Sequence, residues 1–171
     1  MLKPNQPVPS LDLPLTIQAR FNLADQTPEH FTMLVFYRGK HCPICKTYLE
    51  EIGSRLEDIT SRGISPFAIS MDSKERAAVT HEEWATGDLP LCYDLSEDKA
   101  REYGLFISEK REGSEEPDTF SEPGLFLVRP DGTLFFAQTQ SAPFTRPSID
   151  ELLSGVDFVT KENYPARGTL T

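Results

Sequence analysis

The strongest constraint on the fold is a buried-strand pattern followed closely by a helix pattern. Residues Phe31–Tyr37 form a nearly continuous apolar run with β-branched and aromatic members, which is typical of a strand buried on both faces of a sheet. After a short polar break, apolar side chains from Pro43 to Ser61 recur mostly at spacings of three and four, as on one face of a helix. Proline suits a first helical turn, where its missing N–H costs no hydrogen bond. We therefore predict a strand, a break, and a helix that begins at Pro43.

The rest of the chain continues to alternate between strand and helix patterns. Strands alternating with helices favour parallel crossovers, and the Asp131-Gly132 pair between two late apolar runs indicates an antiparallel hairpin. The predicted fold class is therefore α/β, with a central mixed β-sheet flanked by helices on both faces. Further strands are expected at 64–71, 89–93, 124–129 and 133–139, and further helices at 73–84, 96–103 and 148–160.

The length of 171 residues suits one domain of ordinary size. We expect a single domain over 1–171, in which 1–30 is an extended lead-in with room for a small hairpin. Residues 161–171 are expected to be an irregular tail. The charged segment 109–122, which contains glycine and proline, is interpreted as a surface loop.

Charge limits the partners of this protein. The chain has 17 basic and 27 acidic side chains and a formal net charge of −10, which disfavours nucleic acid and anionic membrane surfaces as partners. Residues 1–9 lack the pattern of a secretory leader, and no apolar run is long enough to span a bilayer. We expect a cytoplasmic protein. Paired cysteines in that reducing compartment are more often redox-active or metal-binding than structural.

Cys42 and Cys45, separated by Pro43 and Ile44, lie where the predicted helix begins. The free N–H groups and positive dipole of a helix N-terminus stabilise a thiolate and lower the pKa of its thiol. One helical turn also brings the second sulfur within bonding distance of the first. The pair therefore predicts a catalytic dithiol that cycles to a disulfide.

The two cysteines also allow two alternatives to redox chemistry. A structural zinc site usually has four ligands, and neither Cys92 nor the three histidines add a second ligand pair at short spacing. The cysteines could also be inert core residues in a module that only binds partners. We expect no metal and no cofactor, and we expect Cys92 to be a small core residue.

Three parts of the chain resemble the alkyl hydroperoxide reductase/thiol-specific antioxidant (AhpC/TSA) family of the thioredoxin superfamily. The most specific is Phe36–Cys45, and weaker similarity lies in Leu89–Leu105 and Leu125–Gly132. More narrowly, the chain is similar to peroxiredoxin-like proteins with a Cys-Pro-X-Cys segment. The resemblance implies a thioredoxin-like fold and antioxidant thiol chemistry.

Two departures from the peroxiredoxin pattern concern the site. Peroxiredoxins have a threonine or serine three residues before the peroxidatic cysteine; in that alignment Cys45 is peroxidatic and Cys42 replaces the threonine. They also have an activating arginine before the late strand, where this chain has Pro123. Thioredoxins have a cis-proline there, so a cis Glu122–Pro123 bond is the expectation that this likeness suggests.

The resemblance leaves two assignments of the sulfurs open. In the peroxiredoxin-like one, Cys45 attacks a hydroperoxide and Cys42 resolves the sulfenic acid. In the thioredoxin-like one, Cys42 attacks a protein disulfide and Cys45 resolves. Arg38 and Arg146 are candidate cations for the leaving oxygen, and His41 lies beside the pair. Either assignment implies a thiol reductant such as a thioredoxin or glutathione system, and a homodimer is compatible with both.

Overall fold

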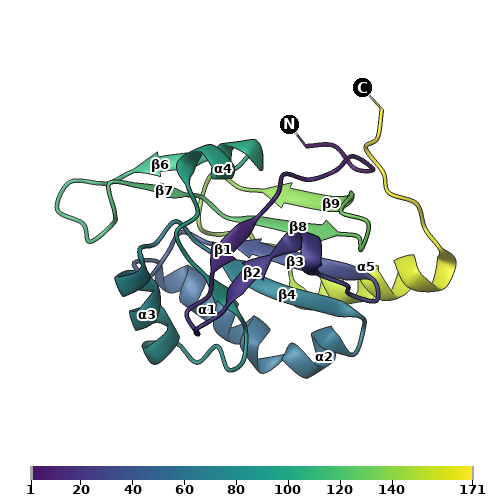
Figure 1. The fold of residues 1–171 in the computed structure, drawn as a ribbon, viewed down its shortest axis with the longest axis horizontal. Coiled ribbons are helices and arrows are strands. Elements are labelled where there is room, and N and C mark those ends of the chain that lie inside the picture. The colour runs from purple at the N-terminus through teal and green to yellow at the C-terminus, as the bar shows by residue number, and fades with distance from the viewer. Residues whose placement is uncertain (1, 171) are drawn as a thin grey trace.

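The computed structural model describes residues 2–170 and has a central sheet of five strands in the order β5-β4-β3-β8-β9. The bounds are β3 Phe31–Phe36, β4 Ile64–Ile69, β5 Leu91–Cys92, β8 Gly124–Val128 and β9 Leu134–Thr139. Strands β3, β4 and β5 are parallel, whereas β8 runs antiparallel to β3 and to β9 (Figure 1). The predicted mixed sheet and late hairpin are confirmed.

Two apolar layers cover the sheet because neighbouring residues of a buried strand face opposite sides. Met33 and Val35 of β3 pack in one cluster with side chains of α1, α2 and α5. Leu34 and Phe36 pack on the other face with α4 and the N-terminal hairpin. The helices are α1 Pro43–Ser54, α2 Leu56–Thr60, α3 Lys74–Glu83, α4 Glu97–Glu102 and α5 Ile149–Glu162.

The single helix predicted over 43–61 is divided in the structure. Arg55 leaves the α-helical region, with φ −114° and ψ 20°, and separates α1 from α2. Its guanidinium binds Asp58 of α2 and Asp150 of α5, contacts that an apolar periodicity does not reveal. Two residues earlier, Gly53 lies so close to the Thr86 carbonyl that a Cβ would be 2.3 Å from its oxygen.

The N-terminal lead-in contains a short antiparallel hairpin of β1, Asp12–Pro14, and β2, Arg20–Asn22. A 3-10 turn over Leu23–Asp25 follows it. At the other end, α5 runs two residues beyond its predicted end and stops at Asn163, whose left-handed backbone closes the helix. No helix or strand is assigned in residues 164–170.

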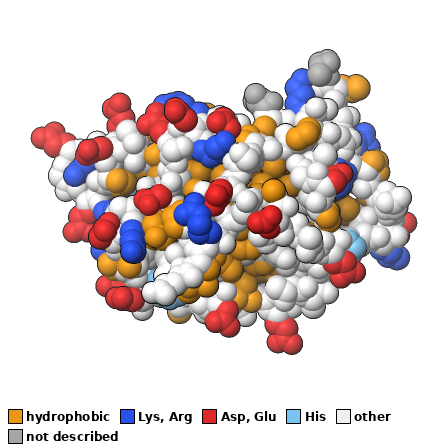
Figure 2. Space-filling view, in the orientation of Figure 1, with side chains coloured by type: hydrophobic (Ala, Val, Ile, Leu, Met, Phe, Trp, Pro, Cys, Tyr) orange, Lys and Arg blue, Asp and Glu red, His pale blue; other side chains and the backbone are white. Residues whose placement is uncertain are grey.

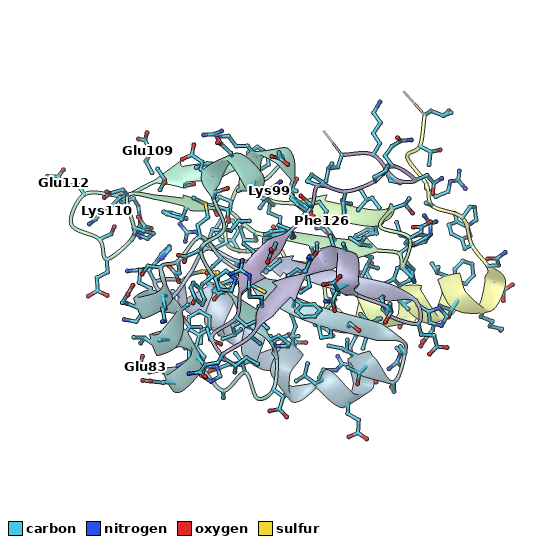
Figure 3. All side chains as sticks on the ribbon, in the orientation of Figure 1. Glu83, Lys99, Glu109, Lys110, Glu112 and Phe126 are labelled. Carbon is cyan, nitrogen blue, oxygen red and sulfur yellow. A yellow bond between two sulfur atoms is a disulfide. The ribbon has the colours of Figure 1, made fainter. Side chains whose placement is uncertain are left out.

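The surface loop predicted over 109–122 is wrong in part. Strands β6, Ile107–Glu109, and β7, Thr119–Ser121, form an antiparallel hairpin. The sequence does not indicate this hairpin because charged, solvated residues lie at its outer end. Figure 3 shows Glu109, Lys110 and Glu112 there, pointing away from the body of the protein. Acidic side chains also gather at this end of the molecule in the space-filling view (Figure 2).

Across residues 2–170, no helix combines the length and apolar character needed to cross a membrane.

Candidate functional site

Cys42 and Cys45 form a disulfide at the N-terminus of α1, with their Cα atoms 5.2 Å apart. As predicted, Pro43 lies in the first helical turn. Cys42 is the N-cap residue, and its Sγ accepts a hydrogen bond of 3.2 Å from the backbone N–H of Cys45. Both side chains are buried, at 1% and 0% exposure, so exposure does not distinguish the attacking sulfur.

The turn before α1 is held by a buried carboxylate. Gly39 adopts φ +125°, and a Cβ there would be 2.6 Å from Asp72 Oδ1. The same carboxylate accepts a 2.7 Å hydrogen bond from the backbone N–H of Lys40, and the Gly39 carbonyl accepts one from the backbone N–H of Cys42. Gly39 and Asp72 thus set where the first cysteine begins the helix.

Arg146 lies beside the second sulfur. Its Nη2 donates to Cys45 Sγ at 2.8 Å, and its guanidinium carbon lies 5.2 Å from the centre of the Tyr48 ring. Tyr48 donates to the Pro147 carbonyl at 2.8 Å, which ties the segment carrying Arg146 to α1. Desolvation by burial lowers the pKa of Arg146 to about 10, so the side chain remains a cation near pH 7.

Arg38, the other candidate cation, is neutralised by acids. It lies 3.4 Å from a carboxylate oxygen of Glu116 and 3.2 Å from one of Glu122, and it stacks over the Phe120 ring at 4.7 Å. Both glutamates are buried. Glu116 also accepts from the backbone N–H of Arg111, and this bond is the main reason why its pKa falls to about 2.

His41 packs against the Phe120 ring at 4.7 Å and lies 3.3 Å from Arg76 through Nδ1. Burial and, secondarily, the positive charge of Arg38 lower the pKa of His41 to about 4. The imidazole is therefore neutral near pH 7, and it does not supply a positive charge to Cys42.

The expected cis bond before Pro123 is wrong, because no cis peptide occurs within residues 2–170. The chain passes through Glu122 and Pro123 in extended form, as the backbone N–H of Glu122 donates to Phe106 and the Pro123 carbonyl accepts from Gln140. A trans bond continues this pairing from β7 into β8. Pro123 is buried and shares a small cavity with Tyr48 and Arg146.

The third cysteine lies away from this chemistry. Cys92 is fully buried in β5, and desolvation raises its pKa to about 12, as expected of a core residue. In the part of the chain that the structure describes, no three His, Cys, Asp or Glu side chains are grouped to hold a metal ion.

Sequence reasoning missed several residues that shape the site. Tyr48 belongs to the apolar face of the helix predicted from Pro43, and its spacing of three from Cys45 places both residues on one side of α1. Asp72 follows β4, and the carboxyl ends of parallel neighbours such as β3 and β4 meet at one sheet edge. Glu116 gave no sequence signal, since it lies in an acidic run.

Solved structures of low sequence identity share this fold. A Mycobacterium tuberculosis peroxidoxin, BcpB, is 19% identical with TM-score 0.74, over 93% of this chain and 99% of its own. A Plasmodium vivax 2-Cys peroxiredoxin, reduced, is 16% identical with TM-score 0.77, over 96% and 86%. A cysteine-to-serine variant of peroxiredoxin 6 from Arenicola marina is 18% identical with TM-score 0.78, over 95% and 76%. The α/β chain therefore has the thioredoxin-like fold of the peroxiredoxins.

A sequence search of curated proteins finds no match. The model of one protein family, the AhpC/TSA family, matches residues 4–137. That match contains the five strands of the central sheet except the last two residues of β9, and it contains both cysteines of the disulfide. The paired thiols at a helix N-terminus, the fold and the family match agree: this chain belongs to the AhpC/TSA family, a family of thiol-dependent oxidoreductases.

Proposed function

We propose that this protein is a thiol peroxidase in which Cys45 attacks a hydroperoxide and Cys42 resolves the product. The observation that carries the proposal is the 2.8 Å contact between Arg146 Nη2 and Cys45 Sγ. A guanidinium at this distance favours the thiolate form of Cys45 once the disulfide is reduced. Its fixed donors can also stabilise negative charge on the leaving oxygen.

The proposed cycle oxidises Cys45 first and then closes the disulfide with Cys42. The Cys45 thiolate attacks the terminal oxygen of the hydroperoxide; a sulfur–oxygen bond forms, the oxygen–oxygen bond breaks, and the alkoxide leaves as the alcohol after taking a proton. Cys45 is then a sulfenic acid. The Cys42 thiol displaces its hydroxyl as water and forms the disulfide. The Cα separation of 5.2 Å lets this bond form without moving the backbone.

An external thiol reductant completes the cycle by supplying two electrons to the disulfide. We propose a thioredoxin or glutathione system, which would reduce the disulfide by thiol exchange, in the cytoplasm where such systems keep thiols reduced. We also propose that residues 1–171 act as one thioredoxin-like domain, supported by matched structures that cover 93% to 96% of the chain. A homodimer of this domain is compatible with the proposal.

The test is to trap the sulfenic acid in single-cysteine variants treated with one equivalent of hydrogen peroxide. We expect rapid dimedone labelling at Cys45 in Cys42→Ser, and no comparable labelling at Cys42 in Cys45→Ser. Cys92→Ser serves as the matched control and should cycle like the native protein. Slow, unselective oxidation of both single-cysteine variants would sink the peroxidase assignment.

One observation favours a second function, the reduction of protein disulfides. The backbone N–H of Cys45 donates to Cys42 Sγ, and the same bond would stabilise a Cys42 thiolate that attacks a disulfide. Insulin reduction distinguishes the two functions. In this second case Cys45→Ser, which retains Cys42, would accumulate a mixed disulfide with insulin, whereas Cys42→Ser would not.

A further inference from the structure

A buried carboxylate contacts the turn that leads into the cysteine pair. Asp72 lies between β4 and α3, and its side chain is 0% exposed. Its own backbone is held in place, because its N–H donates to Ser70 Oγ and its carbonyl accepts from the backbone N–H of Asp94. Burial of a carboxylate is costly unless the group is paired and hydrogen-bonded. The partners of this carboxylate therefore indicate what its burial achieves.

The partners of Asp72 are the turn over residues 39–41 and an arginine of α3. The backbone N–H of Lys40 donates to Oδ2 at 2.7 Å, and Nε of Arg76 donates to Oδ1 at 2.9 Å. Arg76 Nη2 also lies 3.3 Å from His41 Nδ1. Gly39 packs so closely on the carboxyl group that a Cβ would be 2.6 to 2.8 Å from its three atoms. Asp72 and Arg76 thus contact three successive residues of the turn.

The turn fixes the position of Cys42 more directly than that of Cys45. The Gly39 carbonyl accepts a 3.1 Å hydrogen bond from the backbone N–H of Cys42. Cys42 is the N-cap of α1, with φ −104° and ψ 102°, so its backbone lies outside the helical region and is not set by the helix alone. Cys45 lies inside α1, where the helical backbone sets its position. A change in the turn would therefore move the first sulfur relative to the second.

The relative position of the sulfurs decides the fate of a sulfenic acid at Cys45. In one fate the Cys42 thiol displaces the hydroxyl, which leaves as water, and the disulfide forms. In the other a second hydroperoxide transfers its terminal oxygen to the sulfur, which gives a sulfinic acid and the alcohol. Thiols do not reduce a sulfinic acid. The rate of disulfide formation therefore decides how much peroxide the protein tolerates.

We infer that Asp72, held by Arg76, is a positioning residue for the resolving step. It keeps the turn over residues 39–41 in the form that places the Cys42 thiol against the sulfenic acid of Cys45, and so protects Cys45 from over-oxidation. The inference rests on the proposed peroxidase function and deepens it by naming what controls resolution. Arg146 contacts the attacking sulfur, whereas Asp72 acts on the resolving one through the backbone.

The experiment measures the two steps separately in native protein and in Asp72→Asn. Reduced protein is mixed with hydrogen peroxide and quenched at intervals with dimedone, and mass spectrometry follows the thiol, the labelled sulfenic acid, the disulfide and the sulfinic acid. Asparagine keeps the shape of Asp72 but turns an N–H₂ group toward a donor that the carboxylate accepts. We expect the rate constant of disulfide formation to fall at least tenfold, because a misplacement of about 1 Å can cost about 10²-fold. The reaction of Cys45 with peroxide should change less than about twofold, and sulfinic acid formed in excess peroxide should rise.

Asp94→Asn is the matched control. Asp94 is exposed and has a left-handed backbone with φ 57°, which asparagine adopts readily. The same chemical change next to Asp72 should leave both rate constants at their native values.

Arg76→Met tests the same pair of residues if Asp72→Asn does not fold. It removes one partner of the carboxylate and leaves the Lys40 N–H, so resolution should slow less than in Asp72→Asn. Arg76→Lys, which keeps the positive charge, should recover part of the rate. An unchanged resolving rate in the folded variants, or an equal fall in both steps, would overturn the inference, because a general loss of structure slows both.

Equilibration with reduced and oxidised glutathione separates the inference from the peroxidase function because it needs no peroxide. It gives the effective concentration of one thiol at the other, which should fall at least tenfold in Asp72→Asn and stay native in Asp94→Asn. If the native protein forms no sulfenic acid but shows this fall, the peroxidase assignment fails and Asp72 still positions Cys42. If peroxide is reduced but the resolving rate and the effective concentration are both unchanged in Asp72→Asn, the peroxidase assignment stands and the positioning role is excluded.

Discussion

Two arginines near one disulfide differ in what surrounds them. Arg38 lies within ion-pair distance of the buried acids Glu116 and Glu122. Arg146 has no carboxylate of residues 2–170 within that distance, its Nε and Nη1 are buried without a hydrogen-bond partner, and its Nη2 contacts Cys45. Glu116 and Glu122 therefore neutralise the charge of Arg38. Arg146 instead keeps N–H donors that could bind an anion at Cys45.

This difference favours a structural role for Arg38 and a chemical role for Arg146. A buried charge is stable when it is paired, so Arg38 holds the β6–β7 hairpin against the active-site turn through Glu116. An unpaired guanidinium near a sulfur is costly in the absence of an anion. That cost would be relieved when Cys45 ionises, which is why we propose the catalytic role for Arg146.

The largest expected effect tests directly whether Arg146, and not Arg38, takes part in peroxide reduction. Arg146→Met should lower kcat/KM for hydrogen peroxide by about 10²–10³-fold, the usual loss when one donor to a developing oxyanion is removed. Arg38→Met should lower it less than about tenfold. Stopped-flow measurement of peroxide consumption gives both values, and equal losses in the two variants would contradict the comparison.

The second prediction concerns stability, for which we expect the larger effect from the change at Arg38 and the smaller one from the change at Arg146. Arg38→Met leaves Glu116 and Glu122 buried without their cation and should lower the free energy of unfolding by about 3 kcal/mol. Arg146→Met strands no carboxylate and should cost less. Urea denaturation measures both, and Arg38→Met combined with Glu116→Gln and Glu122→Gln should recover part of the loss.

A third, smaller effect is a pH dependence on the Arg38 side of the site. The pKa of His41 is lowered to about 4 by burial and by Arg38, so between pH 6.5 and 4 the unfolded chain binds a proton that the folded chain does not. Stability should therefore be complete above pH 6.5 and fall as the pH drops through this window. We expect a loss of about 2 kcal/mol, less than the full linkage value because solvent screens the half-buried imidazole.

Denaturation of His41→Gln across that window measures this effect, and the pH slope should become shallower than in the native protein. His30→Gln, a change to a histidine remote from the disulfide turn, is the control. A slope unaltered by His41→Gln would show that other groups carry the acid sensitivity.

The smallest expected effect tests whether Tyr48 holds Arg146 in position beside Cys45. Tyr48→Phe removes the hydrogen bond to the Pro147 carbonyl but keeps the ring under the guanidinium. The loss of one such bond is worth about 1 kcal/mol, so peroxide kcat/KM should fall about fivefold. Peroxide kcat/KM should be lower still in Tyr48→Ala. The pH profile of kcat/KM should shift toward higher pH in that variant if Arg146 no longer stabilises the Cys45 thiolate.

The sequence alone determined the elements that depend on local pattern. Apolar runs located β3, β8 and β9, and the caps Ser73, Ser96 and Ser148 lie at the predicted starts of their helices. The disulfide was also predictable, because its two sulfurs are one helical turn apart and need no distant partner. The resemblance of the segments around Cys45 to a known family predicted the thioredoxin-like fold, whereas periodicity predicted only the α/β class.

Only the tertiary structure decided which arginine contacts a sulfur and which one pairs with acids. Arg146 is 101 residues from Cys45, and Glu116 is 78 from Arg38; neither separation leaves a trace in local pattern. The same holds for Glu122–Pro123, whose trans bond follows from pairing with Phe106 and Gln140. Charge pairing and backbone pairing across the fold depend on which distant segments come into contact, whereas the start of a helix depends on its own residues. For this physical reason the helix start and its cysteine pair were predictable from the sequence, and the arginine contacts and the trans bond were not.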